Sequence, residues 1–410
     1  MNGSGIWHAE QAWLGRKAQG VLIEVENGLI TSIKEGAADP ENATRLEGWT
    51  VPGFANTHSH AFQRLLRGEV ESGAGDFWQW RDRMYGYADW EAAEDYFNHA
   101  RRVFREMLEA GYTAVGEFHY LHRHGNELGK ALIEAAREEG IRITLIDACY
   151  LRGGLDGAEL SDEQMSFSDG DADRWARRMD ELQDSDGVRI AAAIHSVRAV
   201  DPESMRIVAA YARERHLPLH IHLAEQPAEV DDCLRFEGCT PAELLEREGI
   251  LGPDLTAVHA IHVNDRDIAR LGANHVSICG CPTTERDLGD NVGPLWGLSL
   301  EGCALTIGSD SNAVIDPLDE ARGLELDQRR ATGRRVLHQP VELLAAATVN
   351  GMRSLGWDAG RIAPGKLADF VTFRGPQTLR RELDPAYLIY ALDARDVTNV
   401  VVGGTTVVSK

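Results

Sequence analysis

Histidine and carboxylate side chains recur in this 410-residue sequence at the ends of short apolar runs. One residue separates His58 from His60, and two such side chains on a strand project to the same side, where both rings can reach one metal ion. A third histidine and an aspartate would complete a metal site that keeps one position open for water. The candidates, in chain order, are His58, His60, His220, His222, Glu225, His259, His262 and Asp310.

Some of these histidines compete for the same role. His222 lies nearer the end of its apolar run than His220, so His222 is the expected ligand and His220 is expected to be a buried, hydrogen-bonded histidine. His262 is similarly expected to be a hydrogen-bonded neighbour of the site. Another group of histidines is expected to form a polar loop, and its members are His119, His122 and His124.

The positions of the lysines and cysteines limit the kinds of metal site that the sequence can form. Between residues 51 and 350 the only lysine is Lys130, inside an expected surface helix, so no strand-end lysine is available to bridge two metals. We therefore expect a single metal ion. Cys279 and Cys281 could form half of a zinc knuckle, but no second pair stands at ligand spacing. Apolar packing at a strand end is the preferred interpretation for them.

Eight apolar runs would position these residues. Segments between them have apolar residues three and four apart and end in glycine, as in 99–111 and 127–140, which predicts helices. Alternating strands and helices predict a parallel sheet, and eight units favour a (β/α)8 barrel, in which the carboxyl ends of the strands meet on one face. The rival is an open doubly wound sheet, but no glycine-rich phosphate loop follows 51–57. The runs span 51–60, 113–122, 141–150, 188–197, 217–225, 255–263, 275–282 and 304–311.

The two ends of the chain differ from its middle. Both are rich in short strand-like runs, and Asn27-Gly28 between two such runs predicts a hairpin. We therefore predict an α/β fold, a TIM-like (β/α)8 barrel over residues 51–359. A small β-sandwich domain would be built from residues 1–50 and 360–410.

The charge balance and hydropathy exclude several classes of protein. Asp and Glu number 65 against 42 Lys and Arg, and the net charge of -23 argues against general nucleic-acid binding. No run approaches the ~20 apolar residues of a membrane helix, and the N-terminal segment lacks the pattern of a secretory signal. A cytoplasmic location with six reduced cysteines is expected.

Longer strings resemble a known family. Pro52-Gly53-Phe54 running into His58-Ser59-His60, followed by HLAE, VHA and GSDS, is similar to the mononuclear deaminase branch of the amidohydrolase superfamily, and this likeness extends over nearly the whole chain. Six strings resemble the formimidoylglutamate deiminases within that branch: HSHAFQRLLRG (58–68), DFWQWRDRMY (76–85), GEFHYLH (116–122), HSVRAV (195–200), HLAEQPAEVDDC (222–233) and CPTTERDLGD (281–290).

The resemblance implies an activity and a set of roles. The activity is hydrolytic deimination of N-formimino-L-glutamate to N-formyl-L-glutamate and ammonia in histidine degradation, by a metal-activated water. One divalent metal is implied, with Zn²⁺ expected and Fe²⁺ the alternative, and so is a homodimer. The implied metal ligands are His58, His60, His222 and Asp310. The implied catalytic residues are Glu225, His259 and Asp310, and the implied substrate-binding residues are Gln63, Arg81, Tyr120, His195 and Arg198.

General chemistry agrees with these roles. A bound Zn²⁺ lowers the pKa of water to about 7, and nearby carboxylates and a histidine can move protons and stabilise developing charge. Arg81 and Arg198 could each grip a substrate carboxylate in a bidentate fork, although the protein is acidic overall. Two rivals remain: a purine or S-adenosylhomocysteine-type deaminase with an apolar, base-stacking pocket, and a binding protein that has lost the chemistry.

Overall fold

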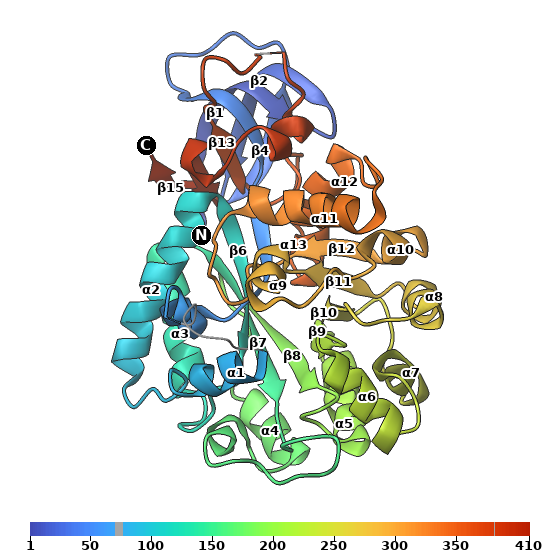
Figure 1. Ribbon diagram of the computed structural model, residues 1–410. Helices are drawn as coiled ribbons and strands as arrows, with labels where there is room; N and C mark the ends of the chain where they lie inside the picture. Colours follow the sequence, from blue (N-terminus) through green and yellow to red (C-terminus); the bar gives the residue numbers. More distant parts are fainter. Residues whose placement is uncertain (70–76, 381) are drawn as a thin grey trace.

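Eight parallel strands form the centre of the molecule (Figure 1). They pair in chain order, and a parallel bridge between Ser59 and Asp310 brings the last strand back to the first. This arrangement confirms the predicted (β/α)8 barrel. The computed structural model describes residues 1–69, 77–380 and 382–410. The strands are β5 (Phe54–Ser59), β6 (Tyr112–His119), β7 (Arg142–Cys149), β8 (Val188–Ser196), β9 (Leu219–Leu223), β10 (Leu255–His259), β11 (Ser277–Gly280) and β12 (Ala304–Ile307).

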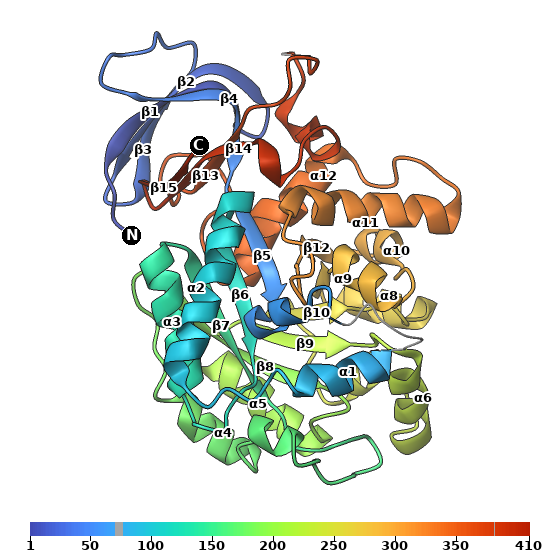
Figure 2. The same cartoon turned by 60° about the vertical axis from the view of Figure 1, so that its left-hand side comes forward.

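Helices pack on the outside of the barrel (Figure 2). The side chains that the strands direct inward are buried as well, so the strands are covered on both faces. All residues of β6 and β7 are buried, which explains why these strands appear in the sequence as continuous apolar runs. The predicted helices 99–111 and 127–140 correspond to residues 99–110 of α2 and to α3. Left-handed glycines, Gly111 and Gly140, end both helices, as the sequence indicated.

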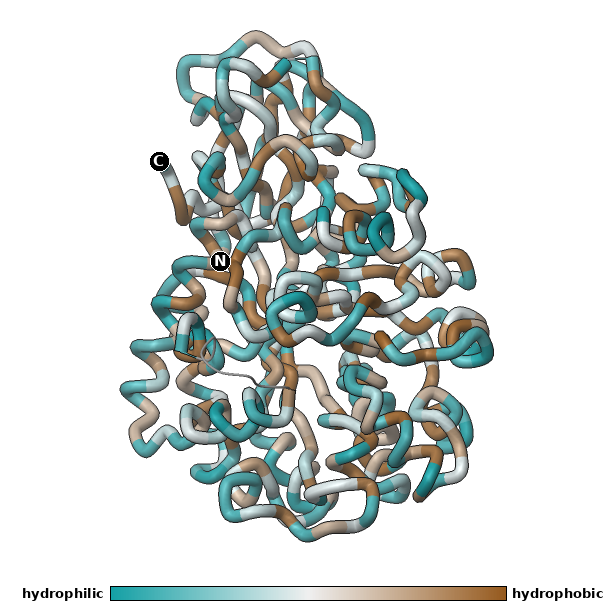
Figure 3. The backbone as a smooth tube through the Cα atoms, in the orientation of Figure 1, coloured by the Kyte–Doolittle hydropathy of each residue, from teal (hydrophilic) through white to brown (hydrophobic). Residues whose placement is uncertain are grey.

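The helices surround the barrel with one face on the strands and one in water. Teal and brown alternate along them in Figure 3, as expected for this arrangement. Within the described ranges we find no helix that combines the length and the apolar character needed to cross a membrane. The helices are α1 (Phe77–Tyr85), α2 (Ala93–Ala110), α3 (Glu127–Glu139), α4 (Ala172–Met179), α5 (Pro202–Glu214), α6 (Pro227–Phe236), α7 (Pro241–Arg247), α8 (Asp265–Ala273), α9 (Pro282–Leu288), α10 (Leu295–Leu300), α11 (Pro317–Thr332), α12 (Pro340–Ala345) and α13 (Gly351–Ser354).

Both ends of the chain contribute to one seven-stranded mixed sheet, which lies beside the barrel (Figures 1 and 2). The predicted hairpin is confirmed, since Asn27 and Gly28 join two antiparallel strands with φ values of 51° and 77°. In spatial order the strands are β15 (Thr405–Ser409), β14 (Val397–Val402), β13 (Phe370–Phe373), β4 (Thr44–Pro52), β1 (Gly5–Trp13), β2 (Lys17–Glu26) and β3 (Leu29–Lys34).

The sheet and the barrel are joined through a short, rigid connection. Only Gly53 separates β4 from β5, and a side chain at this position would lie 2.2 Å from Oγ1 of Thr113. A buried ion pair strengthens the junction: Arg142 on β7 donates from Nε and Nη2 to Asp369, just before β13, at 2.7 and 3.0 Å. The first barrel strand is therefore anchored to the terminal sheet.

Candidate active site

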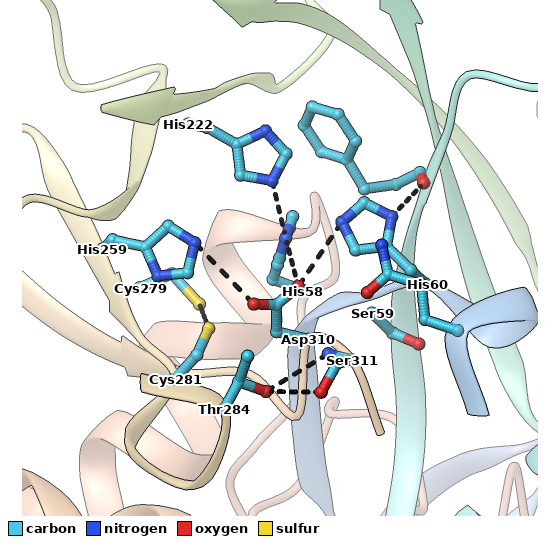
Figure 4. A network of polar contacts seen from close by, with 12 residues as sticks. His58, Ser59, His60, His222, His259, Cys279, Cys281, Thr284, Asp310 and Ser311 are labelled. Carbon is cyan, nitrogen blue, oxygen red and sulfur yellow. Dashed lines mark hydrogen bonds and ion pairs between the residues drawn. The ribbon is translucent and has the colours of Figure 1, made fainter. Parts of the chain in front are cut away.

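Three histidines and an aspartate meet at the carboxyl ends of the barrel strands (Figure 4). His58 and His60 come from the end of β5 and His222 from β9, and a ligand atom of each lies within 4.8 Å of the others. Asp310 follows β12, and its Oδ1 lies 3.4 Å from Nε2 of His58 and 3.5 Å from Nε2 of His60. The structure thus brings together the four residues expected to bind metal.

The hydrogen bonds of these histidines direct their free nitrogens inward. His60 donates Nδ1–H to the carbonyl oxygen of Phe118 at 2.9 Å, and His222 donates Nδ1–H to that of His195 at 3.0 Å. Their Nε2 atoms therefore carry lone pairs, and Nε2 of His222 lies only 3.1 Å from Nε2 of His58. Converging lone pairs at this spacing, beside a carboxylate, fit a divalent cation that prefers nitrogen and oxygen ligands.

Burial sets the protonation of this group. It lowers the pKa of His60 to about 3 and lowers those of His58 and His222, so all three rings are neutral, as ligands must be. For Asp310, burial alone would raise the pKa, but His58, His259 and His60 outweigh it and hold the pKa well below its usual range. Asp310 is therefore ionised.

Glu225 and His259 stand beside Asp310. The Nε2 atom of His259 lies 3.7 Å from Oδ2 of Asp310 and 3.8 Å from Oε1 of Glu225. On its other side, Nδ1 of His259 lies 3.3 Å from Oε1 of Glu285 in α9. Burial alone would lower the pKa of His259, but Glu225, Glu285 and Asp310 outweigh it and raise the pKa well above the usual value. Burial raises the pKa of Glu225.

The backbone carries strain where it delivers these groups. Ala224, His259, Ala260 and Asp310 have φ values of 49°, 71°, 51° and 44°, a left-handed region that residues with a side chain rarely adopt. Such strain collects at functional sites, where the surrounding fold holds a side chain in position. The turns also end the strands, so the polar groups lie just beyond them.

The five residues expected to bind substrate all line one pocket, together with His60, His222 and Asp310 of the metal candidates. Gln63 comes from the 3-10 helix η1 (Ala61–Leu66), and its Nε2 donates to the hydroxyl of Tyr120 at 3.3 Å. Aromatic side chains supply much of the remaining wall: Phe77, Trp80, Tyr85, Tyr150 and Phe167. Asp76, the first residue of the DFWQWRDRMY string, lies outside the described residues.

The two arginines of the pocket have different surroundings. Nε of Arg198 donates to the fully buried Glu229 at 2.7 Å, and its Nη2 lies 3.8 Å from Glu225. Arg81 stacks on Trp78, with Cζ 4.7 Å from the ring centre, and its Nη2 lies 3.7 Å from the exposed Asp82. Arg198 is thus already paired with a buried carboxylate.

Comparison with known proteins places this fold and site in a family. A sequence model of the amidohydrolase family matches residues 49–407. The formimidoylglutamate deiminase of Pseudomonas aeruginosa is 34% identical, over 95% of this chain and 91% of its own length. The chain belongs to the amidohydrolase family.

Other relatives of this amidohydrolase act on different molecules. The 5-methylthioadenosine/S-adenosylhomocysteine deaminase of Natronomonas pharaonis is 30% identical, over 95% of this chain and 88% of its own length. The crystal structure of an amidohydrolase from Brucella melitensis has a TM-score of 0.89 and 31% identity, over 99% of this chain and 95% of that one. The protein is therefore a deaminase-type amidohydrolase, and its relatives differ in substrate.

Several expectations for this amidohydrolase can be compared with the structure. His220 is fully buried, with Nε2 3.3 Å from the carbonyl oxygen of Ser354, as expected. His262 lies outside the histidine set, but its buried Nε2 has no hydrogen-bond partner among the described residues, so the expected hydrogen bond is absent there. Sequence reasoning missed Glu229 and Glu285, although HLAEQPAE and CPTTE place each a short distance from a site residue.

The expected polar loop around His119 is wrong in part. His124 is exposed, but His119 and His122 are buried next to Asp147 between the barrel and its helices. Arg178 of α4 donates from Nη1 and Nη2 to Asp147, each at 2.8 Å, and its Nη2 lies 3.2 Å from the His122 ring nitrogens. The guanidinium of Arg178 already supplies positive charge to these side chains, so the group is a structural ion-pair cluster.

Proposed function

We propose that this amidohydrolase is a formimidoylglutamate deiminase, which hydrolyses N-formimino-L-glutamate to N-formyl-L-glutamate and ammonia. The observation that carries the proposal is a pocket lined by two arginines, Arg81 and Arg198, and by three of the four metal candidates, His60, His222 and Asp310. The substrate has two carboxylates, and arginine binds carboxylates bidentately. The 34% identity to the Pseudomonas aeruginosa enzyme supports the same substrate.

Four residues would hold the metal, namely His58, His60, His222 and Asp310, and zinc suits their nitrogen and oxygen donors. A divalent ion bound there would supply Lewis-acid activation of the attacking water. Asp310 presents Oδ2 toward His259 and can take the proton of that water. The low pKa of Asp310 keeps it ionised and ready to do so.

Glu225 and His259 would handle the reacting amidine. Glu225 can pair with the amidinium nitrogen and then deliver a proton to the departing ammonia, because burial raises its pKa and favours the protonated form. His259, oriented by Glu285, can donate from Nε2 to the oxygen that adds to the carbon. The carbon–nitrogen bond to ammonia then breaks as the carbonyl of the formyl group forms.

The glutamate portion would lie against the arginines and the polar wall. Arg81 and Arg198 would each hold one carboxylate, with Gln63, Tyr120 and His195 completing the contacts. A purine substrate would use the aromatic wall instead and would offer neither arginine a substrate carboxylate. The donors that Arg81 and Arg198 present to the pocket would then gain no contact with the substrate, which favours the dicarboxylate.

The test is ammonia release by the zinc-loaded protein from three compounds: N-formimino-L-glutamate, S-adenosylhomocysteine and 5-methylthioadenosine. We expect turnover of the first, with kcat/KM at least 10³-fold above the other two, on the scale by which sites with matched polar groups reject analogues that lack the partner. Metal analysis of the same sample should give one equivalent. Preferred turnover of either nucleoside would refute the assignment.

A further inference from the structure

A second group of ligand-type atoms adjoins the histidine set. One ring nitrogen of His259, the thiol of Cys281 and a carboxylate oxygen of Asp310 all lie within 4.8 Å of one another. The three residues are at most 6% exposed. Cys281 follows β11 and precedes α9, and Figure 4 shows its sulfur on the same side of Asp310 as His259. The spacing suits ligands around one small cation.

Asp310 can serve both groups at once. Its Oδ1 faces the histidine set, 3.4 Å from Nε2 of His58, and its Oδ2 faces His259, 3.7 Å from Nε2. A carboxylate that shows one oxygen to each side is the arrangement found between paired metals, which lie about 3.5–4 Å apart. The cation site around His259 would therefore share Asp310 with the first metal.

The chemistry of Cys281 selects the kind of ion. Its sulfur lies 4.0 Å from the sulfur of Cys279, and both cysteines are free and fully buried. Thiolate and imidazole together favour soft or borderline cations such as zinc and cadmium over magnesium or calcium. An ion can approach through the substrate pocket, because His259 and Asp310 line its wall.

We propose that His259, Cys281 and Asp310 form a second, inhibitory site for a thiophilic divalent cation. When the ion binds, the S–H bond of Cys281 and the N–H bond of His259 that faces the ion break, both protons leave to solvent, and metal–sulfur and metal–nitrogen bonds form with no change in oxidation state. The ion also occupies the nitrogen of His259 and the second oxygen of Asp310. Inhibition therefore rests on the proposed function, whereas binding of the ion does not.

The probe is Cd²⁺ added to protein that already holds one equivalent of zinc. We expect one further equivalent to bind, with the ultraviolet charge-transfer absorbance of a cadmium–thiolate bond, while metal analysis shows that the zinc is retained. Ammonia release should fall at least 10-fold in parallel. In Cys281→Ser, the absorbance should disappear and the additional Cd²⁺ should bind at least 10-fold more weakly, since even outer-sphere partners change metal affinity by 10- to 100-fold.

Cys303→Ser provides the matched control, because Cys303 is also a buried, free thiol but precedes β12 outside both ligand groups. It should bind Cd²⁺ as the unaltered protein does. X-ray absorption at the cadmium edge tests the unaltered protein directly, so the result holds even if Cys281→Ser fails to fold. Release of zinc without a thiolate signal, a thiolate band that survives in Cys281→Ser, or a cadmium shell without sulfur would overturn the second site.

Discussion

The pairing of Arg198 with Glu229 makes Arg198→Met the most informative substitution in the pocket. We expect two separable losses. The first is substrate binding, because a charge-assisted bidentate contact in a partly dry pocket is worth about 2–5 kcal/mol, or roughly 30- to several-thousand-fold in kcat/KM. The second is stability, because Glu229 would keep a fully buried carboxylate without its cation, at a cost of about 3–5 kcal/mol.

The double variant Arg198→Met/Glu229→Gln separates these losses. Removing the stranded charge should recover most of the free energy of unfolding, measured by urea denaturation, but not kcat/KM for N-formimino-L-glutamate. Arg198→Lys should rescue only in part, because a point charge cannot reproduce the planar fork. Arg189→Met is the control: Arg189 lies on β8, the strand that precedes Arg198, but stacks on Trp357, away from the pocket lining, and should leave kcat/KM within twofold.

The assay compares N-formimino-L-glutamate with two analogues that each lack one carboxylate. For each of Arg198→Met and Arg81→Met, one of the two analogues lacks the carboxylate that the substituted arginine would hold. That analogue should be a poor substrate of the unaltered protein, and its kcat/KM should hardly fall further in the variant. Equal fractional losses on all three compounds would show that the arginines support only the fold, and the assignment of the glutamate portion would fail.

Further substitutions test the metal, the proton carrier and the scaffold. His60→Ala should lose most bound metal and nearly all ammonia release, because one ligand is gone. Glu225→Gln should retain metal and lower kcat by roughly 10²-fold or more, the scale of a lost proton donor. Arg142→Met should lower the free energy of unfolding by about 3–5 kcal/mol while activity per folded molecule is unchanged, since it leaves a buried carboxylate unpaired. Burial alone would raise the pKa of Asp147, but Arg178 outweighs it and holds the pKa well below its usual value. The stability from Asp147 is thus present above the unfolded pKa of about 3.9 and lost as pH falls below it, so Asp147→Asn should flatten the acid end of the stability curve.

Clear results would contradict each of these expectations. A full metal equivalent with normal turnover in His60→Ala would remove that residue from the ligand set. An unchanged kcat in Glu225→Gln would show that Glu225 does not deliver the proton, and this role would then be assigned to His259. Unfolding free energies that match the unaltered protein would show that Arg142 is not needed at the junction. If the free energy of unfolding fell equally with decreasing pH in Asp147→Asn and in the unaltered protein, the expected link between the ionisation of Asp147 and stability would be contradicted.

Local pattern was enough to predict the barrel and the residues at its mouth. Strands of a parallel sheet that are buried on both faces are rich in apolar residues, so each of the eight runs overlaps an observed strand. The ends of the strands were less predictable. The apolar run 255–263 continues past β10. The strand itself stops at His259, because His259 and Ala260 adopt left-handed backbone angles. Hydropathy carries no signal for such a turn, and His262 therefore falls beyond the strand.

Contacts between distant segments could not be predicted in the same way. Glu229 and Glu285 lie on helices that follow the strands, and only the packing of those helices brings them to Arg198 and His259. The buried cluster around His119 depends on the register of β6 against β7, which pairs His119 with Asp147. That register is a property of the closed barrel, and the spacing of residues within one strand does not reveal it.

The direct passage of β4 into β5 links the order of chain synthesis to the assembly of the metal site. Residues 360–410 leave the ribosome after the barrel segment 51–359, so β4 can have β1 on one side early but gains β13 on the other only after the barrel strands have been made. During that interval β4 presents an open edge, where a strand can pair wrongly. The segment leading to His58 is thus fully anchored by a strand that is made after all eight strands of the barrel.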